Sequence, residues 1–211
     1  GYYENYKNDK KLSSYGLEPL IIGDTTIQQL NLIQQKWLDN KFYGININLN
    51  QKVGRFDINY GGSWNKYDGN HYGIINWAEY AVPLNYRWYE NKSNKQYYNV
   101  YVSSNYELNS YLNIFAEIQY RHINYDLNGI HDDLNDITQN HIFNFWNPKG
   151  GIFYTINENN SAYFSVAYSN REPNRDIYTD ADEIQRENIT HEKLIDYELG
   201  YSYRNRKIAL N

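Results

Sequence analysis

The feature that most constrains this chain is a two-residue alternation of apolar and polar side chains that returns in segment after segment. It is clearest in residues 147–175, where two alternating runs flank the polar turn 157–160. The apolar faces of these two runs hold Ile152, Tyr154, Ile156, Ala162, Phe164, Val166 and Tyr168. Because successive side chains of a strand point to opposite faces, this period of two predicts a β-hairpin.

The same alternation predicts eight strands in all. They lie near residues 42–50, 55–65, 96–106, 112–125, 143–156, 162–169, 193–203 and 208–211. Short turns alternate with long polar connections near residues 66–87, 126–140 and 170–192. Outer-membrane barrels place tight turns on one side and long loops on the other, whereas a soluble sandwich has no reason to sort its loops. We therefore predict an all-β chain, an antiparallel up-and-down meander of about eight strands from a larger transmembrane β-barrel, with long extracellular loops and short periplasmic turns.

The first 36 residues show no lasting period, and we expect an extracellular loop region there, with the partial barrel in residues 37–211. Within it, Ile27, Leu30 and Ile33 share one face of a helix, so a short amphipathic helix is predicted over Thr25–Gln35. The chain begins at Gly1 without Met or a leader segment. We therefore expect an internal piece of a longer protein.

Composition narrows the class of protein. A mean hydropathy of -0.86 without a long apolar run excludes a membrane helix, although a barrel strand exposes only alternate residues to lipid. The absence of cysteine excludes a disulfide scaffold, a thiolate zinc site and a cysteine nucleophile. The net charge of -5, with no basic stripe, argues against nucleic acid as a partner.

Two further patterns favour lipid as the environment of the apolar face. The polar face carries charged residues in strand centres, namely Glu117, Arg121, Lys149, Asp196 and Glu198. Aromatic residues gather toward strand ends, as in the girdles at the two interfaces of a bilayer: Tyr43, Trp64, Tyr106, Tyr120, Tyr125, Trp146, Tyr168 and Tyr203. Ordinary cross-strand aromatic pairing is the alternative explanation, and a lipocalin-type barrel would turn its apolar face inward.

Six segments in order resemble the C-terminal half of the barrel of TonB-dependent outer-membrane receptors, particularly those of Bacteroidetes. They are YYENYK (2–7), KWLDNKFYG (36–44), EIQYRHINY (117–125), FNFWNPKGGIFYTI (143–156), NREPNRDIYTDA (170–181) and HEKLIDYELGYSYRN (191–205). The resemblance implies a 22-stranded barrel in the bacterial outer membrane, with a plug domain outside this chain that binds a TonB-type energising protein. It also implies import of a scarce nutrient, and the segment at 171–175 is more similar to receptors for iron complexes, of the siderophore or haem type, than to glycan importers.

No set of residues forms a catalytic pattern, and no cofactor or metal is expected. His131, Asp132 and Asp133 offer ligand atoms for a cation, but solvated loop charge is the favoured interpretation. A barrel hydrolase would need a rim histidine, and His122, interpreted as the only histidine in a strand, lies on an apolar face. We therefore expect no enzyme activity.

Candidate ligand-binding residues lie in the long connections. The first of these connections offers His71, Tyr72 and Trp77, although loop aromatics more often pack the loop itself. Arg171 and Arg175 carry forked donors suited to an anionic ligand, but a structural clasp between either arginine and acidic neighbours such as Asp176, Asp196 or Glu198 is favoured. Import of a glycan and a soluble carbohydrate-binding β module remain as alternative functions.

Overall fold

The structure is a computed structural model that describes residues 1–180, 188–205 and 208–210. Its elements are almost all strands. In chain order they are β1 (Tyr2–Lys11), η1 (Leu12–Tyr15), β2 (Leu20–Ile22), β3 (Thr25–Ile27), β4 (Gln29–Val53), β5 (Phe56–Ala78), β6 (Tyr86–Asn109), β7 (Leu112–Gly129), β8 (Gln139–Asn157), β9 (Asn160–Arg171), α1 (Arg175–Asp180), β10 (Glu192–Arg204) and β11 (Ala209–Leu210). Within the described residues, no helix has both the length and the apolar character needed to cross a membrane.

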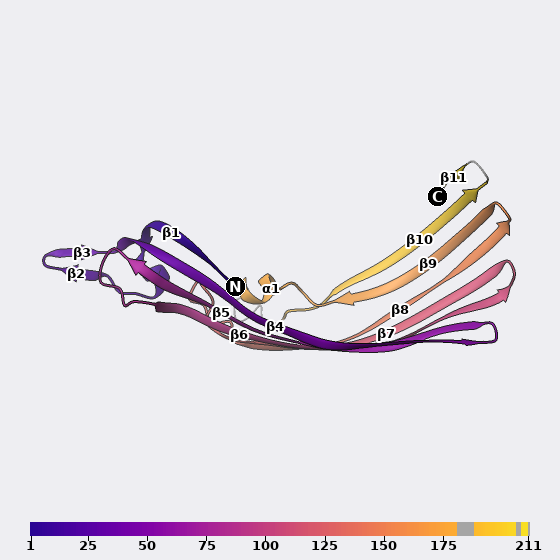
Figure 1. The fold of residues 1–211 in the computed structure, drawn as a ribbon, viewed down its shortest axis with the longest axis horizontal. Coiled ribbons are helices and arrows are strands. Elements are labelled where there is room, and N and C mark those ends of the chain that lie inside the picture. Colours follow the sequence, from indigo (N-terminus) through magenta and orange to yellow (C-terminus); the bar gives the residue numbers. More distant parts are fainter. Residues whose placement is uncertain (181–187, 206–207, 211) are drawn as a thin grey trace.

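Nine strands form one antiparallel sheet in the order β1-β4-β5-β6-β7-β8-β9-β10-β11, and β2 and β3 form a separate hairpin. Each strand of the large sheet therefore pairs with the next one along it, which confirms the predicted meander. The sheet is long and curved, with the tight turns at one end and the β2–β3 hairpin at the other (Figure 1). Among the described residues the sheet is not closed, because β1 and β11 each pair on one side only.

The connections alternate in length as predicted. Two residues separate β4 from β5, β6 from β7 and β8 from β9, at positions 54–55, 110–111 and 158–159. At the opposite end the connections are residues 79–85, 130–138 and 172–191. Residues 181–187, inside the last of these, and residues 206–207 and 211 lie outside the described part of the chain.

Two predicted loops are wrong in extent, because the strands run well past the apolar stripe. The connection expected near residues 66–87 is strand as far as Ala78 and again from Tyr86, and that expected at 126–140 is strand as far as Gly129 and again from Gln139. The ladder from Tyr43 continues without a break through Lys41 and Asp39, whose partners are Asp68 and Asn70. Backbone pairing needs no apolar side chains, so these polar extensions escape a search for hydrophobic alternation.

The prediction for the first 36 residues is also wrong, since this region holds strands and the predicted helix over Thr25–Gln35 is absent. Ten residues form β1, which pairs antiparallel with β4 from Gln29 to Trp37. Leu30 and Leu32 are buried on one face of β4, while Ile33 lies on the other. Spacing alone fits a helix, but the ladders on both sides of β4 give its backbone groups their partners.

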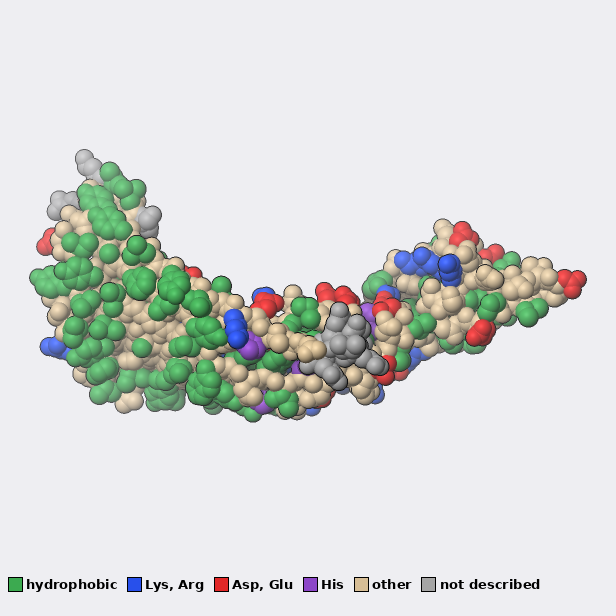
Figure 2. Space-filling model, turned by 180° about the vertical axis from the view of Figure 1, so that it is seen from behind, with side chains coloured by type: hydrophobic (Ala, Val, Ile, Leu, Met, Phe, Trp, Pro, Cys, Tyr) green, Lys and Arg blue, Asp and Glu red, His purple; other side chains and the backbone are tan. Residues whose placement is uncertain are grey.

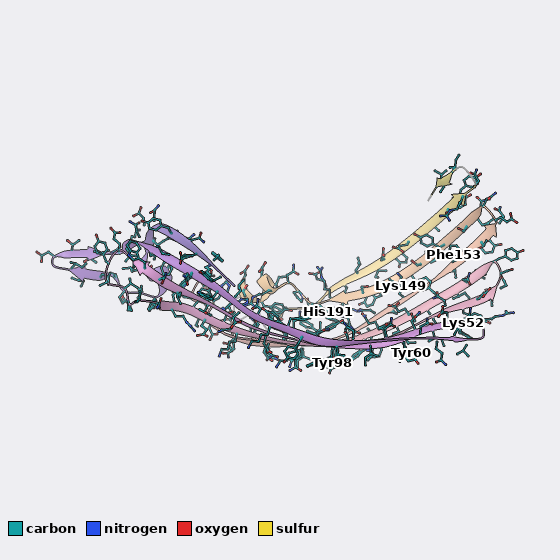
Figure 3. The ribbon with its side chains drawn as sticks, in the orientation of Figure 1. Lys52, Tyr60, Tyr98, Lys149, Phe153 and His191 are labelled. Atoms are coloured by element: carbon teal, nitrogen blue, oxygen red, sulfur yellow. The ribbon has the colours of Figure 1, made fainter. Side chains whose placement is uncertain are left out.

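The two faces of the sheet differ in chemistry over the half that carries the tight turns. The outer face, which bears Tyr60 and Tyr98, is convex, and the inner face, which bears Lys149 and Phe153, is concave (Figure 3). Outer-face side chains remain strongly exposed, with Ile45 at 59% and Leu199 at 83% of full exposure. Figure 2 shows hydrophobic side chains covering this half of the molecule, while charged ones gather toward the middle and the other end. Within the described residues, these side chains do not pack into a core of the chain's own.

The buried clusters lie on the inner face, beyond the apolar stripe. One lies under η1 and consists of Leu12, Tyr15, Leu30, Leu32, Ile75, Trp88 and Tyr89. The other lies under α1 and consists of Ile123, Tyr125, Leu127, Ile137, Phe143, Phe145 and Tyr178. In Figure 1, α1 lies in the hollow of the curved sheet. The 172–191 connection therefore folds back over the sheet in its described part instead of extending away from it.

Candidate functional site

A pocket of about 290 Å³ lies on the inner face, where four adjacent strands meet the start of the β9–β10 connection. Its lining consists of Phe42, Asn65, Tyr67, Lys95, Tyr97, Arg121 and Glu172. The sheet register explains the grouping, because Tyr67 pairs with Phe42 on one side and with Lys95 on the other. Residues paired across strands share a face, so β4, β5 and β6 deliver these side chains to one row.

Two cations share one carboxylate in this pocket. Glu172 accepts a hydrogen bond from Lys95 Nζ at 2.8 Å and lies 3.3 Å from Arg121 Nη2. The Arg121 guanidinium also lies 5.2 Å from the centre of the Tyr97 ring, within the range of a cation–π contact. Its Nε is buried and has no hydrogen-bond partner among the described residues. Lys95, Arg121 and Glu172 together therefore carry a net positive charge. Arg121 Nε is a hydrogen-bond donor without a partner among the described residues.

The ionisation of Glu172 follows from these contacts. Burial alone raises the pKa of this carboxyl, but the hydrogen bond and charge of Lys95, with the charge of Arg121, outweigh burial and lower it. Glu172 is therefore ionised at neutral pH and holds both cations in place.

Arg175 makes a different set of contacts a short distance along the chain. Its guanidinium donates to Ser93 Oγ at 2.6 Å, to Asn91 Oδ1 at 3.0 Å and to the Tyr125 hydroxyl at 3.1 Å. All three partners are neutral, so among the described residues Arg175 does not form the acidic clasp that was predicted for either Arg171 or Arg175. The contacts instead tie the first residue of α1 to β6 and β7.

His71 lies on the inner face of β5, beyond the apolar stripe that ends near Trp64. Its Nε2 is 3.0 Å from Asn40 Oδ1 and 3.3 Å from the Tyr67 hydroxyl. Burial, helped by the charges of Arg175 and His131, lowers the pKa of His71 to about 4. The imidazole is therefore neutral at physiological pH and acts as a hydrogen-bonding group.

The structure separates the five residues expected to bind a ligand. His71 and Arg175 reach the inner face, whereas Tyr72 and Trp77 lie on the outer face, where Tyr72 stacks with Trp37 and Trp77 packs near Tyr6. The predicted clasp of Arg171 exists, but its partner is Glu192, at 2.5 Å, instead of the three acidic residues proposed from the sequence. Tyr72 and Trp77 therefore do not share a site with the other three.

Lys95, Tyr97, Arg121 and Glu172 were missed as site residues. Arg121 stood out in the sequence only as a charge in a strand centre, and the link from Lys95 to Glu172 joins positions 77 residues apart. The sequence did contain one sign of this site. Lysine, arginine and tyrosine residues continue along the polar face of the strands beyond the point where the apolar stripe on the opposite face ends.

Two histidines considered from the sequence, His131 and His122, lie outside the pocket built on Lys95 and Arg121. His131 Nδ1 lies 3.1 Å from Asp132 and 3.3 Å from Asp133, and Asp132 also pairs with Lys36. Lys36 thus pairs with one of the two carboxylates of this loop. His122 stacks on Tyr98 on the outer face, at 4.6 Å between ring centres. It is not the only histidine in a strand, since His71 and His141 lie in β5 and β8.

Comparison with known proteins places this geometry in a family. The sequence model described as "TonB dependent receptor-like, beta-barrel" matches residues 1–211. The chain belongs to this family. TonB-dependent receptors are outer-membrane transport receptors and not enzymes. No curated protein sequence matches the chain.

Two solved structures share the fold at low sequence identity. The ferric-catecholate import receptor Fiu from E. coli K12 superposes with a TM-score of 0.58 at 11% identity, covering 85% of this chain and 30% of its own. The ferric citrate transporter FecA superposes with a TM-score of 0.53 at 13% identity, covering 83% of this chain and 26% of its own. The chain thus spans less than a third of either receptor.

Proposed function

We propose that this chain is part of the barrel wall of a TonB-dependent importer in the bacterial outer membrane, and that the nutrient is an anionic iron complex of the siderophore or haem type. The pocket built on Lys95 and Arg121 supports the choice of ligand. It faces the concave side of the wall, carries excess positive charge and exposes aromatic rings beside it. Carboxylate and catecholate chelates of iron present the negative charge that such a pocket attracts.

The apolar outer face of the sheet supports a position in the membrane. Apolar side chains occupy the alternate positions from Tyr43 to Val53 of β4 except at Gln51, and this stretch matches the 9–11 residues that a tilted strand needs to cross a bilayer. In this arrangement the tight turns face the periplasm, and the strand extensions rise into the medium. Uptake then proceeds by capture of the ligand on the inner face and by rearrangement of a plug domain coupled to a TonB-type protein.

A growth and uptake experiment tests this function. A strain that lacks the full-length gene is supplied with labelled ferric catecholate, ferric citrate, haem or an oligosaccharide as the limiting nutrient. We expect a defect for one of the iron sources, restored fully by the intact gene and only in part by one carrying Lys95→Gln and Arg121→Gln. We expect the pair to weaken uptake affinity about tenfold, the effect of losing about 1.4 kcal/mol of charge attraction.

The matched control is Lys66→Gln, since Lys66 is an outer-face lysine paired with Asp68 at 3.5 Å. It should leave uptake unchanged at equal amounts of protein in the membrane. A defect confined to the oligosaccharide would assign the receptor to glycan import instead. Full uptake by the Lys95 and Arg121 double variant would remove the pocket from the mechanism.

A further inference from the structure

A second pocket, of about 260 Å³, lies between β1, η1 and the β7–β8 connection, and the site described above shares none of its residues. Its lining consists of Lys7, Lys10, Ser14, Tyr15, Gln34, Lys36, Trp88 and Asp132. Three lysines therefore converge on one small space. This end of the sheet is the one opposite the tight turns.

A backbone irregularity brings two of these lysines together. In a regular strand, positions three apart point to opposite faces. The register between β1 and β4 shifts between Lys7 and Lys10, and Asp9 within this bulge adopts a positive φ of 47°. Asp9 N donates to Asn31 Oδ1 at 3.1 Å, which holds the bulge against β4. Bulges of this kind redirect side chains, and here the bulge turns Lys10 to the face of Lys7.

The pocket holds more positive charge than its neighbours neutralise. Lys36 forms an ion pair with Asp132, the single acidic residue of the lining. Lys7 and Lys10 form no ion pair within the described residues. The lining thus has a net charge of +2, although the whole chain carries -5. Positive charges gathered in a recess concentrate the positive electrostatic potential there, and this potential attracts an anion.

Neutral donors complete the lining. Gln34 is 94% buried, and its Oε1 accepts a hydrogen bond from the Tyr15 hydroxyl at 2.7 Å. This contact fixes the amide so that Nε2 remains available as a donor at the pocket. Ser14 adds a hydroxyl. Ammonium, amide and hydroxyl donors in a small recess form the set that carboxylate and phosphate oxygens require.

We propose that this lysine pocket binds a small polyanion that carries carboxylate or phosphate groups. It lies on the same inner face as the Lys95–Arg121 pocket and nearer the connecting loops, so an anionic nutrient meets it first. In this respect the inference rests on the proposed function and adds an outer contact point to it. The bulge at Asp9 places Lys7 and Lys10 on the same face, so that both line the pocket.

Calorimetric titration of the full-length receptor in detergent at low salt, with citrate and inorganic pyrophosphate as probes, tests this inference. We expect binding of at least one probe by the unaltered receptor. Lys7→Gln with Lys10→Gln should weaken it at least tenfold, and so should 0.5 M salt, on the order of magnitude expected for screened charge pairs. Lys41→Gln, an outer-face lysine substitution, should leave the affinity unchanged.

Substitution at Asp9 tests the role of the bulge without removing a lysine. Asp9→Gly keeps the left-handed conformation accessible and should retain binding, whereas Asp9→Val disfavours it and should weaken binding. No binding of either probe, or equal binding by the double-lysine variant, would overturn the inference. Loss of anion binding together with normal iron uptake would leave the proposed function standing. Anion binding without iron uptake would overturn only the proposed function.

Discussion

At the residue scale, single side chains on the inner face are held by partners that are far away in the sequence. Glu172 joins β6 to β7 through Lys95 and Arg121, and Arg175 adds contacts with Asn91 and Ser93. The desolvation of these groups is compensated by charge-assisted hydrogen bonds. The 172–191 connection is therefore anchored to the sheet by its first few residues.

The stability of the folded protein should depend on pH through His71. Its folded-state pKa of about 4 lies below the ordinary value of 6.5, so the neutral imidazole stabilises the fold above pH 6.5. That contribution is lost as the pH falls from 6.5 toward 4, because the unfolded chain takes up the proton more readily. We expect His71→Gln to reduce the pH dependence of stability in this window, measured by thermal unfolding of the full-length receptor. An NMR titration of His71 with a midpoint near 6.5 would contradict it.

At the scale of elements, glycines opposite aromatic rings shape the inner face of the sheet. Gly151 pairs with Phe115, and Gly200 pairs with Tyr163. A Cβ added at Gly200 would lie 2.0 Å from a ring carbon of Tyr163, so the ring occupies the space that a side chain would fill. An aromatic ring that covers a glycine on the neighbouring strand shields its backbone and restores side-chain packing.

Two neighbouring glycines of β8 provide a matched test. A Cβ at Gly151 would lie 2.6 Å from the Phe115 ring and 2.5 Å from the Phe164 carbonyl oxygen, so Gly151→Ala should destabilise the barrel by about 1–3 kcal/mol. At Gly150 the nearest atom is 3.5 Å away, and Gly150→Ala should be neutral or slightly stabilising. Urea unfolding of the refolded full-length receptor measures both. Equal effects of the two substitutions would contradict this account of the packing.

At the scale of the whole molecule, the proposed function makes the sheet a wall with a lipid side and an aqueous side. Residues 39–53 of β4 pair with β5 along one edge. Along the other edge, where β1 pairs as far as Trp37, they have no partner strand among the described residues. A bilayer offers no hydrogen bonds to such an edge, so the 211 residues by themselves are not expected to span one. Under the proposed function, we therefore expect the wall to act only within a closed barrel.

A pair of arginine substitutions on β4 tests the orientation of this wall. Ile47→Arg places a charge on the outer face and should cost about 2–4 kcal/mol, the range for arginine facing the middle of a bilayer. Asn46→Arg places the same charge on the inner face and should cost about 1 kcal/mol or less. Refolding of the full-length receptor into lipid vesicles, followed by denaturant titration, measures both. A larger cost for Asn46→Arg would reverse the assignment of the two faces.

Local sequence patterns were enough to predict the strands in the apolar band, their antiparallel order and the end of the sheet at which the turns are short. Side-chain alternation encodes these features locally, and Ile45, Leu199 and their neighbours lie on the face that it predicts. The tertiary structure decided how far β5 and β6 extend and that β1 replaces a predicted loop, because backbone pairing depends on the neighbouring strand. It also decided that Tyr72 and Trp77 face away from His71. The pairing register between strands sets the face on which each residue lies. The site around Glu172 and the bulge at Asp9 both depend on contacts between residues far apart in the sequence, which the local spacing of residue types cannot predict.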